Sequence, residues 1–372
     1  MKKSLIALAA LAATGAFAQS SVQIDGVMDA GYQSIDYKGT KVNGFNGNGS
    51  TTSQINFRGV SDLGGGLKAD FRVETDWNTV SNSANTGVGK AAGVAAGASS
   101  LASGAGFGNG EIRTGLAGGF GKVQFGAINN NSLIANLTGQ PFGTAIGSAH
   151  GAVIRSNSAG NAVRNDNSFQ YISPNFSGFD VAYLQSNAQS KAGTANNVNF
   201  SSTLGAYLQN GAKEASVSYT NGPLAARFTN LKEDNSPNNA GSSAKNTTLN
   251  TLGANYAFGD AKVFLWNQTN KAEDGSRNIT ATTVSATYTL GATVLMAQTG
   301  SAKNKLATGT GAGGTSKLTS IGADYNLSKT TALYGRYESL KDAGNVAAAA
   351  ATLDGTATGT RTRLGLGIRT AF

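Results

Sequence analysis

The chain has 372 residues, with 29 lysines and arginines against 20 aspartates and glutamates, no cysteine and one histidine. The lack of cysteine excludes disulfides, a thiol nucleophile and a thiolate metal site, and the single His150 leaves few general bases for neutral pH. The basic residues stand singly among carboxylates rather than in a patch, which argues against nucleic acid binding.

The first residues, MKKSLIALAALAATGAFAQS, have the pattern of a secretory signal peptide. Two lysines precede an apolar run, and Ala16 and Ala18 stand before an expected cleavage site at Gln19. The run is too short to span a bilayer as a helix, and no apolar stretch of about 18 to 20 residues follows it. We therefore expect a signal peptide at 1–18, an exported domain at 19–372 and no helical membrane span.

Two-residue alternation is clearest in LKADFRVETDW, 67–77, where apolar and charged residues take turns. Successive side chains of a strand point to opposite faces, so this segment would have one apolar and one charged face. The preceding QINFRGV alternates too, and we place Val60 on the apolar face with Ile55 and Phe57, after a slip by one residue. Glycines in the intervening SDLGGG permit a tight turn, so the two segments are predicted to form a hairpin.

Similar alternating segments continue to the end of the chain. With the first hairpin they give sixteen predicted strands, most of them about ten residues long, as transmembrane strands are. The other fourteen are expected at 22–35, 111–118, 121–128, 167–173, 178–186, 213–221, 224–232, 248–258, 261–270, 279–290, 292–300, 317–327, 331–340 and 360–372.

Connections between the predicted strands alternate in length. Short turns such as GGFG and PNFSG are followed by long segments rich in Gly, Ala, Asn and Ser, such as 78–110 and 129–166. This regular segregation is typical of an outer-membrane barrel. A half-buried sheet of a soluble protein would explain any single strand equally well, but it does not explain sixteen in succession.

The last predicted strand, RTRLGLGIRTAF, shows what such a barrel requires. Arg361, Arg363 and Arg369 would face a watery interior, whereas Leu364 and the terminal Phe372 would lie on the lipid side. Only a closed barrel lets a strand sit in lipid with all of its backbone groups paired. The pattern therefore predicts an all-β fold, an antiparallel transmembrane barrel.

SDLGGGLKADFRVE, the AFAQSSVQIDG start, the PNFSGF turn, LSKTTALYGRY and the GIRTAF ending resemble the general porins of β-proteobacteria, of the Burkholderia, Comamonas and Neisseria type. The resemblance covers the whole mature chain. It implies a 16-stranded antiparallel barrel, a homotrimer and a third loop folded inward as a constriction. It also implies passage of small hydrophilic solutes, often with anion preference, and a terminal Phe372 that signals to the outer-membrane assembly machinery.

Three positions depart from the pattern of that family. The second strand keeps Arg58, but Gln54 stands where the family usually has a first arginine. Gly110 takes the place of an arginine before the fourth strand, and Ala127 that of an arginine at the end of the fifth. These departures lower the anion preference that we expect.

By the same resemblance, the third long loop, 128–166, is the candidate constriction. We expect two of its arginines to face basic residues across the lumen, and carboxylates on the same wall either to oppose them in a transverse field or to pair with them. Fixed charge on a low-dielectric wall concentrates counter-ions. The residues expected at the constriction are Arg58, Lys68, Arg72, Glu74, Asp76, Glu111, Arg113, Arg155 and Arg164.

The function expected from these observations is that of a general diffusion porin of the bacterial outer membrane, with mild anion preference. A substrate-selective channel for phosphate or organic acids, and a surface receptor or adhesin that binds through its long loops, remain alternatives. We expect no enzyme activity, metal or cofactor. The expected partners are two further copies of the chain in a homotrimer, lipopolysaccharide and membrane lipid, small and preferentially anionic solutes, and the assembly machinery, but no nucleic acid.

Overall fold

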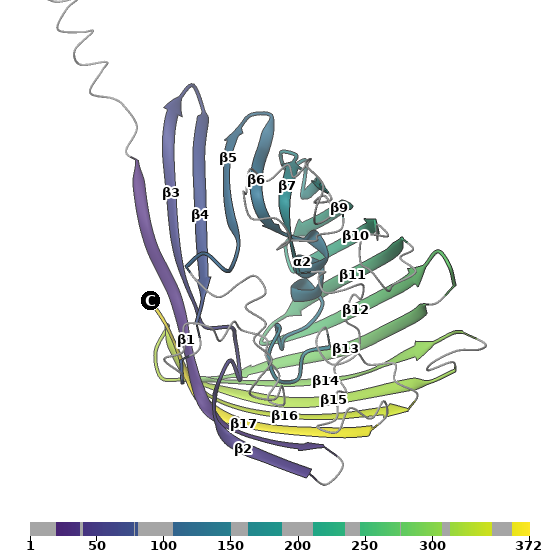
Figure 1. Cartoon of the computed structure of the whole chain (residues 1–372). Coiled ribbons are helices and arrows are strands. Elements are labelled where there is room, and N and C mark those ends of the chain that lie inside the picture. Colours follow the sequence, from purple (N-terminus) through teal and green to yellow (C-terminus); the bar gives the residue numbers. More distant parts are fainter. Residues whose placement is uncertain are drawn as a thin grey trace, which may run out of the picture.

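The structure is a computed structural model, and it describes residues 20–37, 40–77, 79–80, 107–149, 163–187, 211–234, 246–275, 277–306, 313–343 and 359–372. These residues form one sheet of seventeen strands and the helix α2 (Figure 1). The predicted signal peptide and Arg155 lie outside the described residues. The elements are β1 (Ser21–Tyr37), β2 (Thr40–Gly47), β3 (Gln54–Gly64), β4 (Leu67–Asp76), β5 (Ile112–Gly118), β6 (Gly121–Asn129), α2 (Asn131–Thr138), β7 (Arg164–Ile172), β8 (Phe179–Ser186), β9 (Gly211–Asn221), β10 (Leu224–Asp234), β11 (Thr247–Phe258), β12 (Ala261–Ala272), β13 (Asn278–Leu290), β14 (Thr293–Asn304), β15 (Thr315–Asn326), β16 (Thr331–Ala343) and β17 (Gly359–Ala371).

The sheet closes on itself. From β3 to β17 each strand pairs antiparallel with the next, β17 pairs with β1, and the first half of β1 pairs with β3. Figure 1 shows the first and last strands side by side, and α2 in the interior of the barrel. The ring contains every described strand except β2, so the predicted 16-stranded antiparallel barrel is confirmed.

Strand β2 has no counterpart among the sixteen strands that the sequence predicts. It pairs with the second half of β1, on the edge that β3 occupies further down, and so extends the wall beyond β3. Its sequence, TKVNGFNG, has two glycines and two asparagines, which are poor strand formers. Pairing with the long β1 supplies the backbone partners that its composition does not predict.

The outer face of the barrel is apolar, as predicted. In β17, Leu364, Leu366 and Ile368 are between 43% and 59% exposed, whereas the alternate residues Arg361 and Gly365 are buried toward the interior. Many other large apolar side chains are exposed in the same way along the described strands. Such a surface suits lipid, because apolar-out and polar-in alternation is what a membrane barrel needs.

The first hairpin turns through three glycines with positive φ. Gly64, Gly65 and Gly66 have φ of 84°, 60° and 81°, values that side chains with a Cβ rarely adopt. The slip in register occurs between Asp62 and Gly64, later than expected. Val60 lies opposite Asp70 and on the face of Arg58, so its placement on the apolar face was wrong.

The two ends of the barrel differ. Short connections such as 65–66, 222–223 and 291–292 lie at one end, called here the turn end, and the longer connections lie at the other, the loop end. In outer-membrane barrels the short turns face the periplasm and the long loops the outside. Within the described ranges, no helix is both long and apolar enough to cross a membrane.

The terminal Phe372 extends the seam between β1 and β17 by one residue pair beyond Ala371. Its backbone N–H donates to the carbonyl of Gly26, and the Gly26 N–H donates to the carbonyl of Phe372, both at 3.0 Å. A Cβ on Gly26 would lie 2.7 Å from the ring atom Cζ of Phe372. Glycine at this position therefore makes room for the terminal ring.

Candidate pore constriction

The loop after β6 folds into the barrel, as expected. It enters through α2, whose N-terminus rests on Glu214 of β9: the N–H groups of Asn131 and Ser132 donate to this carboxylate at 2.5 and 2.7 Å. The first N–H groups of a helix lack partners within the helix, and the helix dipole favours a negative charge there. Glu214 is fully buried, so it anchors the start of the constriction loop.

The middle of the loop packs tightly against β11. A Cβ on Gly253 would lie only 1.7 Å from the carbonyl oxygen of Ala135 in α2, so glycine is required for this close approach. The side-chain amide of Asn255 donates to the carbonyl of Thr138 at 2.8 Å. These contacts hold α2 on the inner wall of β11.

The tip of the loop is fixed to the wall around Gly147. Its N–H donates to Glu338 of β16 at 2.9 Å, and its carbonyl accepts from Gln298 of β14 at 2.9 Å and Ser320 of β15 at 3.0 Å. The loop therefore follows the inner wall from β9 to β16 and narrows the lumen from that side. Residues 130–149 carry no charged side chain, so this described part of the loop is a neutral face.

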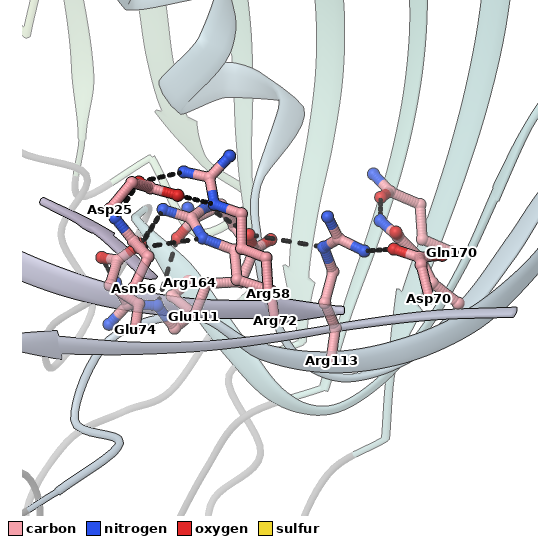
Figure 2. Close-up of polar contacts among 12 residues, drawn as sticks. Asp25, Asn56, Arg58, Asp70, Arg72, Glu74, Glu111, Arg113, Arg164 and Gln170 are labelled. Carbon is pink, nitrogen blue, oxygen red and sulfur yellow. Dashed lines mark hydrogen bonds and ion pairs between the residues drawn. The ribbon is translucent and has the colours of Figure 1, made fainter. Parts of the chain in front are cut away.

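The other arc of the ring, from β3 to β7, carries a row of cations. Arg58 lies directly opposite Arg72, and Arg72 lies opposite Arg113, on three adjacent strands. Like charges opposite each other in a sheet repel, so such a row needs anions among its members. Figure 2 shows carboxylates between the arginines.

The charged side chains of this arc form one cluster, called here the wall cluster, with Arg72 at its centre. It donates to Glu111 at 2.7 Å and to the side-chain carbonyl of Asn56 at 2.8 Å, and it also forms an ion pair with Glu74 (Figure 2). Both carboxylates are largely buried, with Glu74 5% and Glu111 6% exposed. Burying charge is costly unless it is paired, which the guanidinium of Arg72 achieves.

Ion pairs extend the wall cluster to both sides of Arg72. Arg58 pairs with Asp25 of β1 at 2.9 Å. Arg113 pairs with Asp70, which also accepts from Lys122 of β6 at 2.9 Å. The expected rows of arginine and carboxylate are thus interleaved in one wall, and the predicted pairing is the arrangement observed.

Arg164 belongs to the same wall, so its expected position on a loop across the lumen was wrong. It is the first residue of β7, and it contacts Glu74 at 3.4 Å, the side chain of Asn129 at 3.1 Å and the carbonyl of Asn109 at 3.2 Å. The loop ends before it, and pairing of β7 with β6 carries the side chain to the cluster.

Two other predicted residues lie at the margins of the cluster. Asp76 is the last residue of β4 and its backbone N–H donates to Asn109 at 2.6 Å. Lys68 is exposed near the turn end of β4, at a distance along the strand from Arg72. Asp25 and Lys122 were not named in advance, although both are charged residues at inward positions of predicted strands.

A second charged cluster lies on β15–β17, under the loop tip. Glu338 is fully buried, pairs with Arg361 at 2.7 Å, and also binds Arg363. Asp324 pairs with Arg336 at 2.7 Å and with Arg369 at 3.5 Å. Arginines at alternate positions of the last strand signalled this cluster, but its carboxylates could be located only once the strands were aligned.

Among the residues that the structure describes, no three His, Asp or Glu side chains gather as metal ligands would.

Comparison with known proteins shows the same architecture. The family model described as Gram-negative porin matches residues 4–365. The chain is 33% identical over 356 residues to outer membrane porin protein 32 of Delftia acidovorans, with 92% of this chain and 90% of that protein covered. It is 31% identical over 185 residues to the major outer membrane protein P.IB of Neisseria gonorrhoeae, covering 48% and 46% of the two chains.

Solved structures agree with this result. An anion-selective porin from Comamonas acidovorans superposes with a TM-score of 0.72 at 25% identity, covering 95% of this chain and all of that one. The trimer form of OmpT from Vibrio cholerae gives 0.62 at 16% identity over 95% and 99% of the chains, a likeness of fold alone. The closed barrel, its inward loop and these matches together show that the chain belongs to the Gram-negative porin family and is a porin of the bacterial outer membrane, a channel without catalytic activity.

Proposed function

We propose that this porin is a general diffusion channel for small hydrophilic solutes and ions, with a mild preference for anions. The observation that carries the preference for anions is the exposed fraction of the two side chains in each lumen ion pair. In ten of the twelve ion pairs between described residues, the cationic side chain is more exposed than the carboxylate.

Three pairs illustrate the difference in depth. The side chain of Arg58 is 44% exposed and that of its partner Asp25 is 22%. For Arg363 and Glu338 the values are 21% and 0%, and for Arg369 and Asp324 they are 36% and 11%. Solutes in the lumen would therefore meet guanidinium groups first, although the lumen wall carries similar numbers of positive and negative side chains.

The preference for anions should be mild, because the cations of the lumen are paired with carboxylates. A carboxylate lies within ion-pair distance of each wall arginine, and a solute at the water interface feels both charges. Salt screens exposed charges, with a Debye length of about 10 Å at 0.1 M, so the preference should also fall at high ionic strength. The anion-selective Comamonas porin supports the sign of the preference, not its size.

The proposed constriction consists of the wall cluster and the neutral loop facing it. Arg58, Arg72, Arg113 and Arg164 would provide the cationic side of the opening, with Glu74, Asp76 and Glu111 behind or beside them. Lys68 would act nearer the periplasmic mouth, and Arg155 is proposed from the sequence alone. The exposed guanidinium groups of the wall cluster, together with Arg363 and Arg369 of β17, would raise the local concentration of anions in the opening.

The proposed assembly is a homotrimer, which is common among porins, and the trimer form of OmpT is consistent with it. Phe372 is proposed as the signal that the assembly machinery reads, and lipopolysaccharide as the lipid neighbour of the outer surface.

Swelling of liposomes that contain the purified protein tests the general diffusion role. We expect uptake of neutral sugars to fall smoothly with solute size and to rise in proportion to concentration. Phosphate and short organic acids should enter without saturation. Saturable uptake of one such acid at low concentration would reject general diffusion and favour a substrate-selective channel.

A further inference from the structure

The helix of the inward loop presents two apolar side chains to the lumen. In α2, Ile134 is 37% exposed and Leu137 is 42% exposed. They stand three residues apart, so they lie on one face of the helix. Another face is buried against the wall, where the carbonyl of Ala135 packs on Gly253 of β11. We call Ile134 and Leu137 the apolar face of α2.

The interior of a water-filled barrel is an unusual place for exposed apolar side chains. Interior residues of porin barrels are polar as a rule, and the other apolar residues of α2, Leu133 and Ala135, are buried. Packing against the wall therefore does not account for the apolar character of Ile134 and Leu137. Because these two residues stand where solutes pass, they offer a contact surface to whatever moves through the neck.

The apolar face of α2 lies across the lumen from the wall cluster. Eight steps of strand pairing lead from β3 to β11, one for each strand from β4 to β11, which is half of the ring of sixteen. The strand against which α2 packs is therefore diametrically opposite β3. Arg58 of β3 is the most exposed cation of the wall cluster, so its guanidinium group and the apolar face border the same opening from opposite sides.

Contacts at the start of the inward loop place the two sides at a similar depth in the barrel. The side chain of Asn129 accepts from Arg164 of the wall cluster at 3.1 Å, and its backbone N–H donates to Glu111 of the same cluster at 3.2 Å. The helix starts only two residues later, at Asn131. A solute in the constriction therefore has guanidinium groups on one side and the apolar face of α2 on the other.

We propose that the apolar face of α2 makes the constriction favour organic anions with an apolar body, such as aliphatic monocarboxylates, over hydroxylated anions with the same number of carbons. The carboxylate lies toward the guanidinium groups, which bind it through charge and hydrogen bonds. The hydrocarbon part covers Ile134 and Leu137, which removes apolar surface from water. Weak contacts of this kind raise the concentration of a solute in the neck without retaining it. The proposal rests on the proposed anion preference and refines it to a class of solute.

Reversal potentials in planar bilayers test the proposal with hexanoate and gluconate, two anions with the same number of carbons. Both are ionised at neutral pH, and gluconate carries hydroxyl groups where hexanoate has a plain alkyl chain. Sodium hexanoate on one side and sodium gluconate on the other give the ratio of the two permeabilities. The variant combines Ile134→Gln and Leu137→Gln, because glutamine is a good helix former and retains α2. Leu63→Gln is the matched control, since Leu63 is exposed beside the turn of the first hairpin, away from the constriction.

We expect the ratio of hexanoate to gluconate permeability to fall about twofold in the double variant, since the alkyl chain loses an apolar contact on one side. The control should keep the native ratio. The ratio of hexylammonium to glucamine permeability, for two cations with the same difference in hydroxylation, should be unchanged, because the wall opposite α2 repels cations. The ratio of Cl⁻ to K⁺ permeability is measured in the same bilayers. A native channel that prefers K⁺ would contradict the proposed function, whereas an unchanged hexanoate-to-gluconate ratio in the double variant would contradict only the role of the apolar face.

Three results would overturn the proposal. An unchanged hexanoate-to-gluconate ratio in the double variant would show that these solutes do not contact α2. An equal fall in Leu63→Gln would show that the effect does not arise at the constriction. An equal fall in the hexylammonium-to-glucamine ratio would show that the apolar face receives apolar bodies of either charge, so the class of solute would be wrong. Should the double variant fail to fold, the two single variants provide the same comparison, each with a smaller expected fall.

Discussion

The proposed anion preference rests on single ion pairs of the lumen. Counting residues gives no strong preference, because arginines and carboxylates are interleaved along the wall. Depth is what distinguishes them: Asp25 lies behind Arg58, and Glu338 lies behind Arg363. A guanidinium at the water interface attracts an anion more than a buried, already paired carboxylate attracts a cation.

Arg58 is the most exposed member of the wall cluster, so Arg58→Gln should lower the ratio of Cl⁻ to K⁺ permeability. A reduction of about twofold is expected, because the partner Asp25 then remains uncompensated beside the lumen. Reversal potentials in planar bilayers measure the ratio. Lys41→Gln, outside the lumen, should leave it unchanged, and an equal change in that variant would show that the effect is not local.

Glu338 joins two arginines to the tip of the inward loop. Glu338→Gln would leave Arg361 and Arg363 without their carboxylate, and removing one partner from a buried ion pair costs about 3 to 5 kcal/mol. We expect a lower temperature of heat denaturation in detergent and noisier single-channel currents, since the amide of Gly147 also loses a charged acceptor. Glu273→Gln, in an exposed turn, is the control; similar losses in both variants would contradict the anchoring role.

At the level of secondary structure elements, the strands were predictable and the path of the loop was not. Alternation identified the sixteen barrel strands, because two different media select residues on the two faces of each strand. It missed β2, whose pairing depends on the unusual length of β1, and it could not indicate α2, whose stability comes from Glu214 and from the space at Gly253. Those contacts join residues far apart in the chain.

The positions of the arginines show the same limit of prediction from sequence. Residues within the first hairpin, such as Arg58 and Arg72, could be assigned to one face from spacing alone. The sequence places Arg164 in the loop, because its position as the first residue of β7 depends on where pairing with β6 begins. The relative depth of Asp25 and Arg58 is a property of packing, and no spacing encodes it.

Because α2 packs closely on β11, a larger side chain at Gly253 should displace the inward loop. Gly253→Ala would place a Cβ only 1.7 Å from the carbonyl oxygen of Ala135, so α2 must shift away from the wall and into the lumen. Single-channel conductance should change, most simply to a lower value. Gly335→Ala, whose Cβ would meet one side-chain atom at 3.4 Å, should conduct like the native protein. Unchanged conductance in Gly253→Ala would show that the loop does not set the size of the opening.

Phe372 adds the last residue pair to the seam between the first and last strands. Its deletion removes two backbone hydrogen bonds to Gly26 and the ring above this glycine, and it also removes the proposed assembly signal. We expect a several-fold lower yield of heat-modifiable protein in the outer membrane. Phe372→Tyr retains the backbone and an aromatic ring and should restore the yield, whereas full yield after deletion would reject both roles.

The whole molecule is a closed sheet with lipid on one side and water on the other, and its charges are distributed accordingly. Arginines line the interior on β3–β7 and on β16 and β17, and Arg227 of β10 lies between these two groups. The inward loop is neutral where it is described and lies against one side of the interior. In the proposed channel, solutes would meet the charges of the interior, and the outer surface would meet lipid.

In the proposed channel, cationic groups of the lumen ion pairs stand closest to the passing solute. The zero-current potential of the native channel in a planar bilayer, recorded across a KCl gradient at low ionic strength, tests it most directly. We predict a sign showing that Cl⁻ passes more readily than K⁺, and a smaller potential when the same gradient is made at high salt. A potential of the opposite sign, showing that K⁺ passes more readily, would mean that the carboxylates and not the guanidinium groups dominate the field in the lumen.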